Sequence, residues 1–193
     1  MVEKNIRLIV GLGNPGKEYS ETRHNAGFWF SDELAKSCGV TFKKEAKFFA
    51  DVCQINLNGH NAWLVKPTTF MNRSGQSVSA IAAYYKIAPE EVLVIHDELD
   101  HDAGSVRLKM SGGHAGHNGL RDIISALGTK DFLRMRLGIG HPGTKKQVVD
   151  FVLGVPSRED DQKIHESIQN GLRVVDDLLA GSIQIAMNKL NSA

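Results

Sequence analysis

Six polar residues able to bind or activate a small molecule stand beside apolar runs of this sequence: Asn14, His24, Asn72, Asp97, His117 and Asn118. A neutral imidazole can take a proton from water near neutral pH, and a neighbouring carboxylate can fix its tautomer and stabilise the cation. Amide side chains can hold a carbonyl group or the oxyanion that develops from it. These residue types indicate hydrolysis by an activated water, with His24 and Asp97 as the pair of interest.

The same residues also have a purely structural interpretation. Asparagines satisfy turns in many loops, and a histidine near a helix start can serve as a cap. For any single asparagine the structural interpretation is favoured. For His24 with Asp97, the residues alone leave both interpretations open.

Apolar runs and turn residues predict strands and helices in alternation around these positions. Strands are expected at 6–10, 48–57, 62–65, 92–95, 105–110 and 134–139, with a hairpin turn at Asn58-Gly59. Helices are expected at 24–37, from Ser74 or Ser77 to 86, at 120–127 and from 156 onwards. Asn14, Asn72 and Asp97 follow predicted strands, and α/β proteins place their sites in such strand-end loops.

Three other kinds of site fit less well. The pattern Gly11-x-Gly13-x-x-Gly16 matches a dinucleotide fingerprint, but a polar loop follows it where that fingerprint requires a helix. His114-x-x-His117 together with His96 or Asp97 suggests a metal site, yet this spacing is not the helical i,i+4 arrangement of a zinc protease. No serine stands in a GxSxG elbow, so a serine nucleophile is not indicated.

Length and composition predict one globular domain spanning residues 1–193. Lys plus Arg number 23 and Asp plus Glu number 22, so any basic footprint for nucleic acid must be local. Cys38 and Cys53 lack CxxC spacing and are expected to be reduced, buried thiols. We find no targeting segment and no apolar run long enough for a membrane helix, which together favour a cytoplasmic location.

Six segments resemble those of bacterial peptidyl-tRNA hydrolase, in the family's order: VGLGNPG (10–16) followed by Tyr19, TRHNAG (22–27), FMNRSG (70–75), HDELD (96–100), GHNGLRD (116–122) and GIGHPG (138–143). The similarity covers nearly the whole chain. It implies a single α/β domain with a twisted, mostly parallel mixed β-sheet flanked by α-helices. It also implies a monomer that needs no cofactor or metal and cleaves the ester joining a peptide to the terminal ribose of tRNA.

The resemblance carries roles onto individual residues. His24 corresponds to the general base that activates water, and Asp97 to the carboxylate that orients and polarises it. Asn14 and Asn72 resemble amides that position the substrate, and Asn118 resembles the residue that holds water and substrate on the tRNA side. The remaining residues implied to line the cleft are Tyr19, Met71 and His117.

Lys109 and Arg136 resemble the family's clamp on the 5′ phosphate of tRNA. The leading alternative to an enzyme is an RNA-binding module with a vestigial pocket and a basic face made of Lys109, Arg134, Arg136, Lys145 and Lys146. The pairing of His24 with Asp97 argues against that alternative. Turnover of a peptidyl-tRNA substrate distinguishes the two.

One position departs from the family's pattern. Ala115 stands in the segment Ser111-Gly112-Gly113-His114-Ala115-Gly116 where a glycine is more usual. If the backbone there requires a positive φ, alanine is strained. The departure concerns the local conformation of the loop and not the activity.

Overall fold

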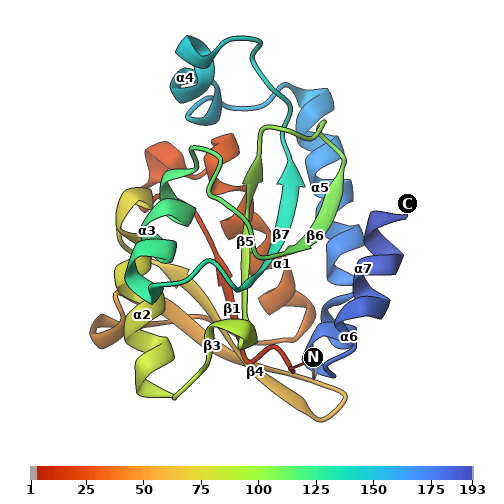
Figure 1. Cartoon of the computed structure of the whole chain (residues 1–193). Coiled ribbons are helices and arrows are strands. Elements are labelled where there is room, and N and C mark those ends of the chain that lie inside the picture. Colours follow the sequence, from red (N-terminus) through yellow and green to blue (C-terminus); the bar gives the residue numbers. More distant parts are fainter. Residues whose placement is uncertain (1–3, 193) are drawn as a thin grey trace.

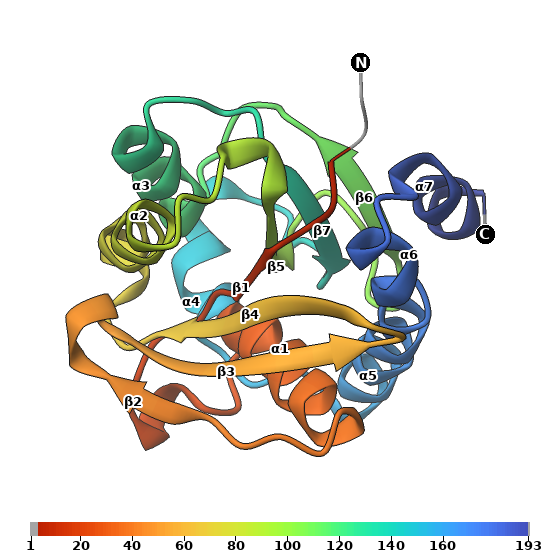
Figure 2. The same cartoon turned by 90° about the horizontal axis from the view of Figure 1, so that it is seen from below.

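One seven-stranded sheet forms the centre of the computed structural model, which describes residues 4–192. The strands follow the spatial order β2-β3-β4-β1-β5-β7-β6. Their bounds are β1 (Leu8–Gly11), β2 (Lys43–Glu45), β3 (Ala50–Leu57), β4 (His60–Pro67), β5 (Val92–Glu98), β6 (Val106–Met110) and β7 (Leu133–Gly138). Figure 2 shows how strongly the sheet twists from β2 to β6.

The four central strands, β4, β1, β5 and β7, run parallel to one another. The outer strands β3 and β6 pair antiparallel with β4 and β7, and β2 pairs antiparallel with β3. The prediction of a twisted, mostly parallel mixed sheet is therefore confirmed. Because the parallel strands point the same way, their carboxyl ends meet at one edge of the sheet, where a site can form.

Helices cover both faces of the sheet (Figure 1). On one face, α1 (Ala26–Ser37), α5 (Arg158–Leu172), α6 (Val175–Leu179) and α7 (Ile183–Asn191) bury apolar side chains against the strands. On the other face, α2 (Ser74–Tyr84) and α3 (Asn118–Leu127) do the same. The short α4 (Val148–Val152) projects beyond the end of the sheet at which β5 and β7 finish (Figure 1). Among the helices of residues 4–192, none has the length and apolar character of a membrane-spanning segment.

The continuous apolar run of β5, Val92 to Ile95, packs against both helical layers. Leu93 and Ile95 pack in the layer with α1 and α5, whereas Val92 and Val94 pack in the layer with α2 and α3. Side chains of successive strand residues point to opposite faces. Asp97 is two residues beyond Ile95, so its side chain lies on the same face of the sheet as Leu93 and Ile95, where α1 begins.

Several local predictions are confirmed, and others need correction. The Asn58-Gly59 hairpin exists, with φ of 51° and 88° at its two central residues, as a turn of type I′ requires. Neither Ser74 nor Ser77 caps α2: Arg73 holds the capping position, and the Ser74 hydroxyl instead donates to the carbonyl of Met71. β4 extends beyond the expected 62–65, whereas α2 ends at Tyr84, before the expected residue 86.

Three further corrections concern segments with weak sequence signals. β5 continues through Glu98, so His96 and Asp97 lie within the strand and not after it. The expected terminal helix is divided into α5, α6 and α7. Cys53 is buried and free as predicted, but Cys38 is only half-buried.

The glycine-rich loop before α3 contains Ala115 at a φ of 48°, which is the left-handed conformation. The condition under which alanine is strained is therefore met. A left-handed non-glycine residue costs roughly 1–2 kcal/mol, and the entropy that glycine adds to the unfolded chain offsets about 0.4–1 kcal/mol of it. We expect Ala115→Gly to raise the free energy of unfolding by about 0.5–1 kcal/mol, measured by urea denaturation.

The matched control is Ala83→Gly, because Ala83 is exposed and lies in α2 with helical backbone. That change should lower the free energy of unfolding by about 0.5–1 kcal/mol. An Ala115→Gly protein with a lower urea midpoint and an unchanged slope would show that the loop is not strained at this residue.

Candidate active site

A cavity of about 700 Å³ opens at the carboxyl ends of the parallel strands. Seven of the residues predicted from the sequence line it: Asn14, His24, Met71, Asn72, Asp97, His117 and Asn118. They come from segments far apart in the chain, which the parallel strands and the starts of α1, α2 and α3 bring together. The cavity is thus the place where the predicted chemistry has to occur.

His24 lies in a 3₁₀ turn, Arg23–Asn25, that leads directly into α1. The residue is 9% exposed, and Nδ1 lies 2.9 and 3.0 Å from the two carboxylate oxygens of Asp97. An ionised carboxylate can only accept hydrogen bonds, so Nδ1 of His24 carries the hydrogen. Nε2 of the neutral ring is then left as a hydrogen-bond acceptor, which is what a general base needs.

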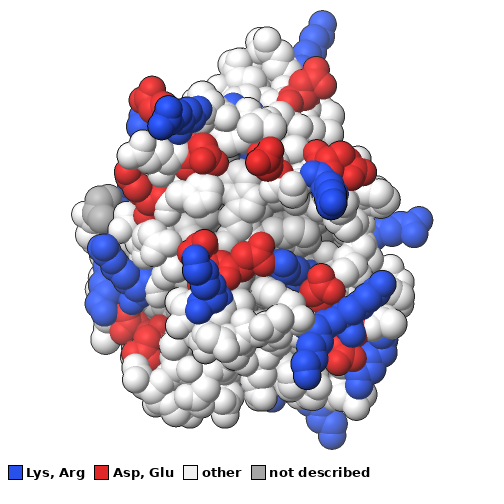
Figure 3. Space-filling model, turned by 180° about the vertical axis from the view of Figure 1, so that it is seen from behind, with Lys and Arg blue, Asp and Glu red and all other residues white. Residues whose placement is uncertain are grey.

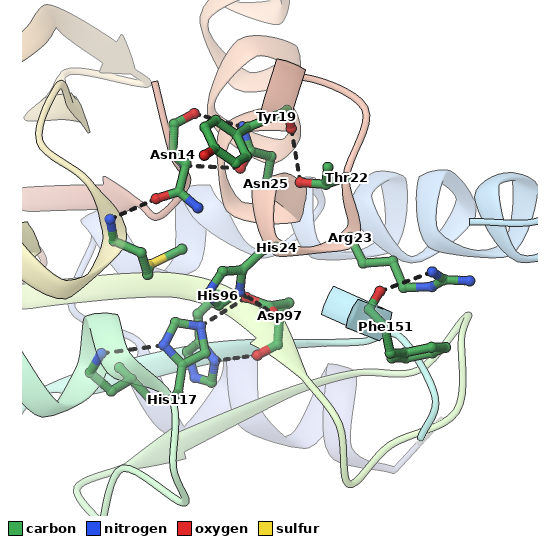
Figure 4. Close-up of polar contacts among 12 residues, drawn as sticks. Asn14, Tyr19, Thr22, Arg23, His24, Asn25, His96, Asp97, His117 and Phe151 are labelled. Atoms are coloured by element: carbon green, nitrogen blue, oxygen red, sulfur yellow. Dashed lines mark hydrogen bonds and ion pairs between the residues drawn. The ribbon is translucent and has the colours of Figure 1, made fainter. Parts of the chain in front are cut away.

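Asp97 is 3% exposed and binds a second imidazole (Figure 4). Its Oδ1 accepts from Nε2 of His117 at 2.8 Å. His117 caps α3, and its Nδ1 accepts from the backbone N–H of Leu120 at 3.3 Å. Because Nδ1 is committed as an acceptor, Nε2 must donate, so Asp97 receives hydrogen bonds from both histidines.

Burial and charge act in opposite directions on this group. Burial favours the neutral carboxyl of Asp97, but the two histidines and their hydrogen bonds outweigh it and hold the pKa of Asp97 well below its usual range. Burial lowers the pKa of His24, but the adjacent carboxylate outweighs it and raises this pKa above 6.5. Asp97 is therefore ionised, and His24 gains a proton more readily than a free imidazole.

The three side chains of His24, Asp97 and His117 also form a group whose ligand atoms lie within 4.8 Å of one another, as a metal site would require. Their hydrogen bonds do not fit that use. Both ring nitrogens that face Asp97 carry hydrogen. A metal ion on Nε2 of His117 would force its hydrogen onto Nδ1, directly against the N–H of Leu120. The arrangement is a hydrogen-bonded network and not a ligand set.

His96 makes no side-chain hydrogen bond to this network, although its ring lies edge-on to that of His117 with centroids 5.1 Å apart. Its Nδ1 donates to the backbone carbonyl of Asp97 at 2.8 Å. Burial and the nearby His117 lower the pKa of His96 to about 3, so the ring is neutral at physiological pH. Its Nε2 is buried and has no hydrogen-bond partner among the described residues.

The three asparagine side chains at the cavity differ in the hydrogen bonds that hold them. Oδ1 of Asn14 accepts from the N–H of Met71 at 2.7 Å, and Asn25 fixes the backbone of Asn14 through two hydrogen bonds of 2.9 and 3.0 Å (Figure 4). This leaves the NH₂ group of Asn14 as a donor at the cavity. Asn72 is exposed and lines the same cavity. Asn118 is also exposed, and its Oδ1 accepts from Arg121 at 3.1 Å.

Tyr19 is not among the residues that line the cavity. Its ring packs edge-on against Phe70, with centroids 6.2 Å apart and an interplanar angle of 86°. Phe70 is 56% exposed and lines the cavity itself. The structure thus puts Tyr19 behind the cavity wall, in contact with a residue that sequence reasoning did not single out.

Lys109 and Arg136 also lie outside the cavity, on β6 and β7. In the register of these strands Lys109 is opposite Arg134, and Arg107 is opposite Arg136. Lys109 and Arg136 are therefore diagonal neighbours on the same face of the sheet, close enough for long side chains to reach one ligand. Arg107 shares this face, as the alternation along β6 requires, but its Nη1 donates to the backbone carbonyl of Asn191 at 2.6 Å.

The basic face of the alternative RNA-binding module must be corrected, because Arg134 is only 2% exposed. Its guanidinium donates to the backbone carbonyls of Gly112 and Gly113 at 2.5 and 2.6 Å and to that of Lys130 at 3.2 Å. Arg134 thus holds the glycine-rich loop and is unavailable to a polyanion. The face seen in Figure 3 does not offer another purely basic surface, because its Lys and Arg are interspersed with Asp and Glu.

The apolar wall of the cavity was not predicted. It comes from α4 and the residue after it, through Val148, Val149, Val152 and Leu153. The helix has five residues, and its valines have no distinctive spacing. Only the folded chain brings this segment over the strand ends.

Known proteins supply the last observation. The family model for peptidyl-tRNA hydrolase matches residues 8–193. A peptidyl-tRNA hydrolase of Neisseria meningitidis serogroup A is 54% identical over 97% of both chains, and one of Ruthia magnifica is 52% identical over 97% of this chain and 98% of its own. The crystal structure of peptidyl-tRNA hydrolase from Acinetobacter baumannii superposes with a TM-score of 0.95 at 49% identity, covering 97% of this chain and 95% of that one. This chain belongs to the peptidyl-tRNA hydrolase family.

Proposed function

We propose that this chain hydrolyses the ester between peptide and tRNA with a water molecule that His24 activates and Asp97 assists. Membership of the family supports the reaction. The observation that carries the mechanism is the pair of contacts, 2.9 and 3.0 Å, between Nδ1 of His24 and the carboxylate of Asp97. They leave Nε2 of a cavity-lining imidazole ready to accept a proton.

The reaction follows from which nitrogen atoms of the site carry hydrogen and which can accept it. Nε2 of His24 takes a proton from water while the water oxygen attacks the ester carbonyl carbon. Asp97 stabilises the imidazolium that forms, and the NH₂ groups of Asn14 and Asn72 are suited to hold the oxygen that gains negative charge. Collapse of the intermediate expels the ribose oxygen, which takes the proton back from His24. Peptide and tRNA are released, and the base is regenerated.

His117 acts through Asp97 in this proposal. Its hydrogen bond to Oδ1 keeps the carboxylate ionised and oriented while His24 changes charge. Met71 supplies apolar surface and the backbone N–H that orients Asn14. Asn118 lies at the start of α3, where its NH₂ group is available to water or substrate.

The proposal also covers the extent of the domain, the location of the protein, its oligomeric state and its independence of cofactors. Residues 1–193 form a single hydrolase domain, supported by one sheet that runs without interruption from β2 to β6. The protein acts as a cytoplasmic monomer on peptidyl-tRNA, and the reaction needs no cofactor or metal. The hydrogen-bonded state of His24, Asp97 and His117 supports this, because each nitrogen that faces the carboxylate is a donor.

The test is turnover of a purified peptidyl-tRNA. We expect the wild-type protein to release peptide and intact tRNA at catalytic concentrations of enzyme. Binding of tRNA without release of peptide would instead favour an RNA-binding module. The burial of Arg134 already weakens that alternative, since it removes one of the five proposed basic residues from the surface.

The clamp assignment leads to a prediction of its own. Replacing Lys109 or Arg136 by alanine should raise KM for peptidyl-tRNA with a smaller change in kcat, because the lost contact is charge-assisted binding. The slope of log affinity against log salt should flatten by roughly 0.7–0.9 per lost phosphate contact. Arg136→Lys should recover only part of the loss, since lysine lacks the guanidinium fork.

The control for the clamp is a substrate without the 5′ phosphate, on which both variants should show almost no further loss. Lys36→Ala removes an exposed lysine of α1 and should change neither KM nor the salt slope. If the Lys109 and Arg136 variants lose as much on the dephosphorylated substrate as on the normal one, these residues act elsewhere.

A further inference from the structure

The helix α4 is too short to hold its own position. It has five residues, and isolated helices of that length are not stable in water. Its packing is limited: Val152 is buried and Val148 and Phe151 lie against the core, but Val149 is 63% exposed. Yet α4 supplies the apolar wall of the cavity. Contacts with residues outside α4 must therefore fix the position of this apolar wall.

Arg23 makes three such contacts with the end of α4, and Figure 4 shows its hydrogen bond to the Phe151 carbonyl. Its backbone N–H donates to the carbonyl of Gly154 at 3.0 Å, and its Nη1 donates to the carbonyl of Phe151 at 3.0 Å. The guanidinium also lies over the Phe151 ring, 4.0 Å from the centroid. Carbonyls at the end of a helix lack partners within it, and an arginine can satisfy them while stacking on an aromatic ring.

Arg23 also belongs to the 3₁₀ turn that carries the proposed base, His24. Arg23 directly precedes His24 in the 3₁₀ turn that opens α1. That turn is itself fixed, because the N–H of Asn25 donates to the carbonyl of Thr22 and the Asn25 side chain binds the backbone of Asn14. One residue thus joins a rigid turn that carries the base to a short helix in which only Val152 is buried.

We propose that Arg23 is a positioning residue that sets the distance between the apolar wall of α4 and His24. The inference rests on the proposed function, because it assigns Arg23 to the same site. Substrate binds between wall and base, so a loosened wall weakens binding more than it slows the proton transfer. Arg23 does not touch the His24 ring in any contact within the described residues, so the acid–base behaviour of His24 stays the same.

The first test observes the wall without using activity. The amide hydrogens of Leu153 and Gly154 bond to the carbonyls of Val149 and Phe151 at 3.1 Å each, so their exchange with solvent reports on the end of α4. In Arg23→Ala we expect these amides to exchange roughly tenfold faster or more, since a charge-assisted hydrogen bond and a cation–π contact are both lost. Amides in β1 and β5 should exchange at the wild-type rate.

The second test uses steady-state kinetics on peptidyl-tRNA. For Arg23→Ala we expect KM to rise roughly tenfold while kcat falls by less than about threefold, because the lost contacts position the wall and not the reacting atoms. The pH at which kcat/KM reaches half its plateau should not move. Arg23→Lys should recover part of the loss, because it keeps the charge without the fork and the stacking surface.

Phe151→Leu gives a second route to the same answer, since it removes the ring and leaves the backbone carbonyl in place. It should show a smaller effect than Arg23→Ala, and the two changes combined should lose less than the sum of the separate effects. Arg173→Ala, an exposed arginine after α5, is the matched control and should behave as wild type in exchange and kinetics. If Arg23→Ala does not fold, Arg23→Lys and Phe151→Leu decide the question.

The possible failures are separable. A wild-type protein without turnover would overturn the proposed function, while exchange at Leu153 and Gly154 would still show whether Arg23 holds α4. Unchanged exchange at these amides, or an unchanged KM in the folded variants of an active enzyme, overturns the role of Arg23 alone. A shift of the pH profile in Arg23→Ala overturns it as well, since it would mean that Arg23 acts directly on His24.

Discussion

Replacing His24 by alanine is expected to lower kcat/KM for peptidyl-tRNA by about 10²–10⁴-fold, the usual contribution of a general base. Neither of the two neighbouring imidazoles, His96 and His117, can take over its position. His96 is neutral with its Nδ1 bonded to a backbone carbonyl, and Nε2 of His117 is bonded to Asp97. The residual rate should come from substrate positioning by the amides alone. The measurement is single-turnover and steady-state release of peptide.

The variant should remain folded, because His24 lies at the edge of the core and Asp97 keeps its hydrogen bond to His117. Affinity for tRNA should change little, since the proposed role of His24 is proton transfer. His60→Ala, a histidine of the β3–β4 hairpin outside the cavity, is the matched control and should retain full activity. A folded His24→Ala protein within a few-fold of the wild-type rate would remove His24 from the mechanism.

Sequence reasoning located most of the site because the fold obeys a simple rule. Asn14, Asn72 and Asp97 lie at or just beyond the carboxyl ends of β1, β4 and β5. In a parallel arrangement these ends converge, so polar residues at strand ends predict a shared site without any knowledge of the contacts. His24 was within reach of the same argument, because it opens the helix that follows β1.

What the sequence did not reveal depends on contacts between distant segments. His117 was expected only to line the cleft, but the capping position it takes on α3 turns its Nε2 toward Asp97. Arg134 has the same alternating spacing as Arg136, yet the glycine-rich loop folds over it and accepts its hydrogen bonds. α4 has only five residues, too few for a periodic apolar signal, and its contacts with Arg23 join segments far apart in the sequence.

Replacing Asp97 by asparagine is expected to lower kcat/KM by about 10²–10³-fold through two effects. Oδ1 of Asp97 accepts from both histidines, and Oδ2 lies 2.9 Å from Nδ1 of His24. Whichever way the amide is oriented, its NH₂ group faces a ring nitrogen that carries hydrogen. To avoid this clash His24 must move or transfer its hydrogen to Nε2, which then can no longer accept a proton from water.

The second effect is on the pH profile. In the wild-type protein the carboxylate raises the pKa of His24 above its usual value, despite the opposing effect of burial. Only the neutral ring is a base, so wild-type kcat/KM should fall as the pH drops through that raised pKa. Without the carboxylate, burial alone acts on His24 and lowers its pKa. The acid limb of the Asp97→Asn profile should therefore lie at lower pH than that of the wild type, on a much lower plateau.

The measurement is kcat/KM across the pH range in which both proteins remain folded, as checked by circular dichroism at each pH. Asp102→Asn is the control, because Asp102 is exposed and its side chain has no hydrogen-bond partner within residues 4–192. It should keep both the plateau and the position of the acid limb. A folded Asp97→Asn protein with the wild-type plateau would show that the carboxylate does not assist the base. A reduced plateau with an unmoved acid limb would show that Asp97 orients His24 without changing its affinity for the proton, since only the electrostatic effect shifts the pKa.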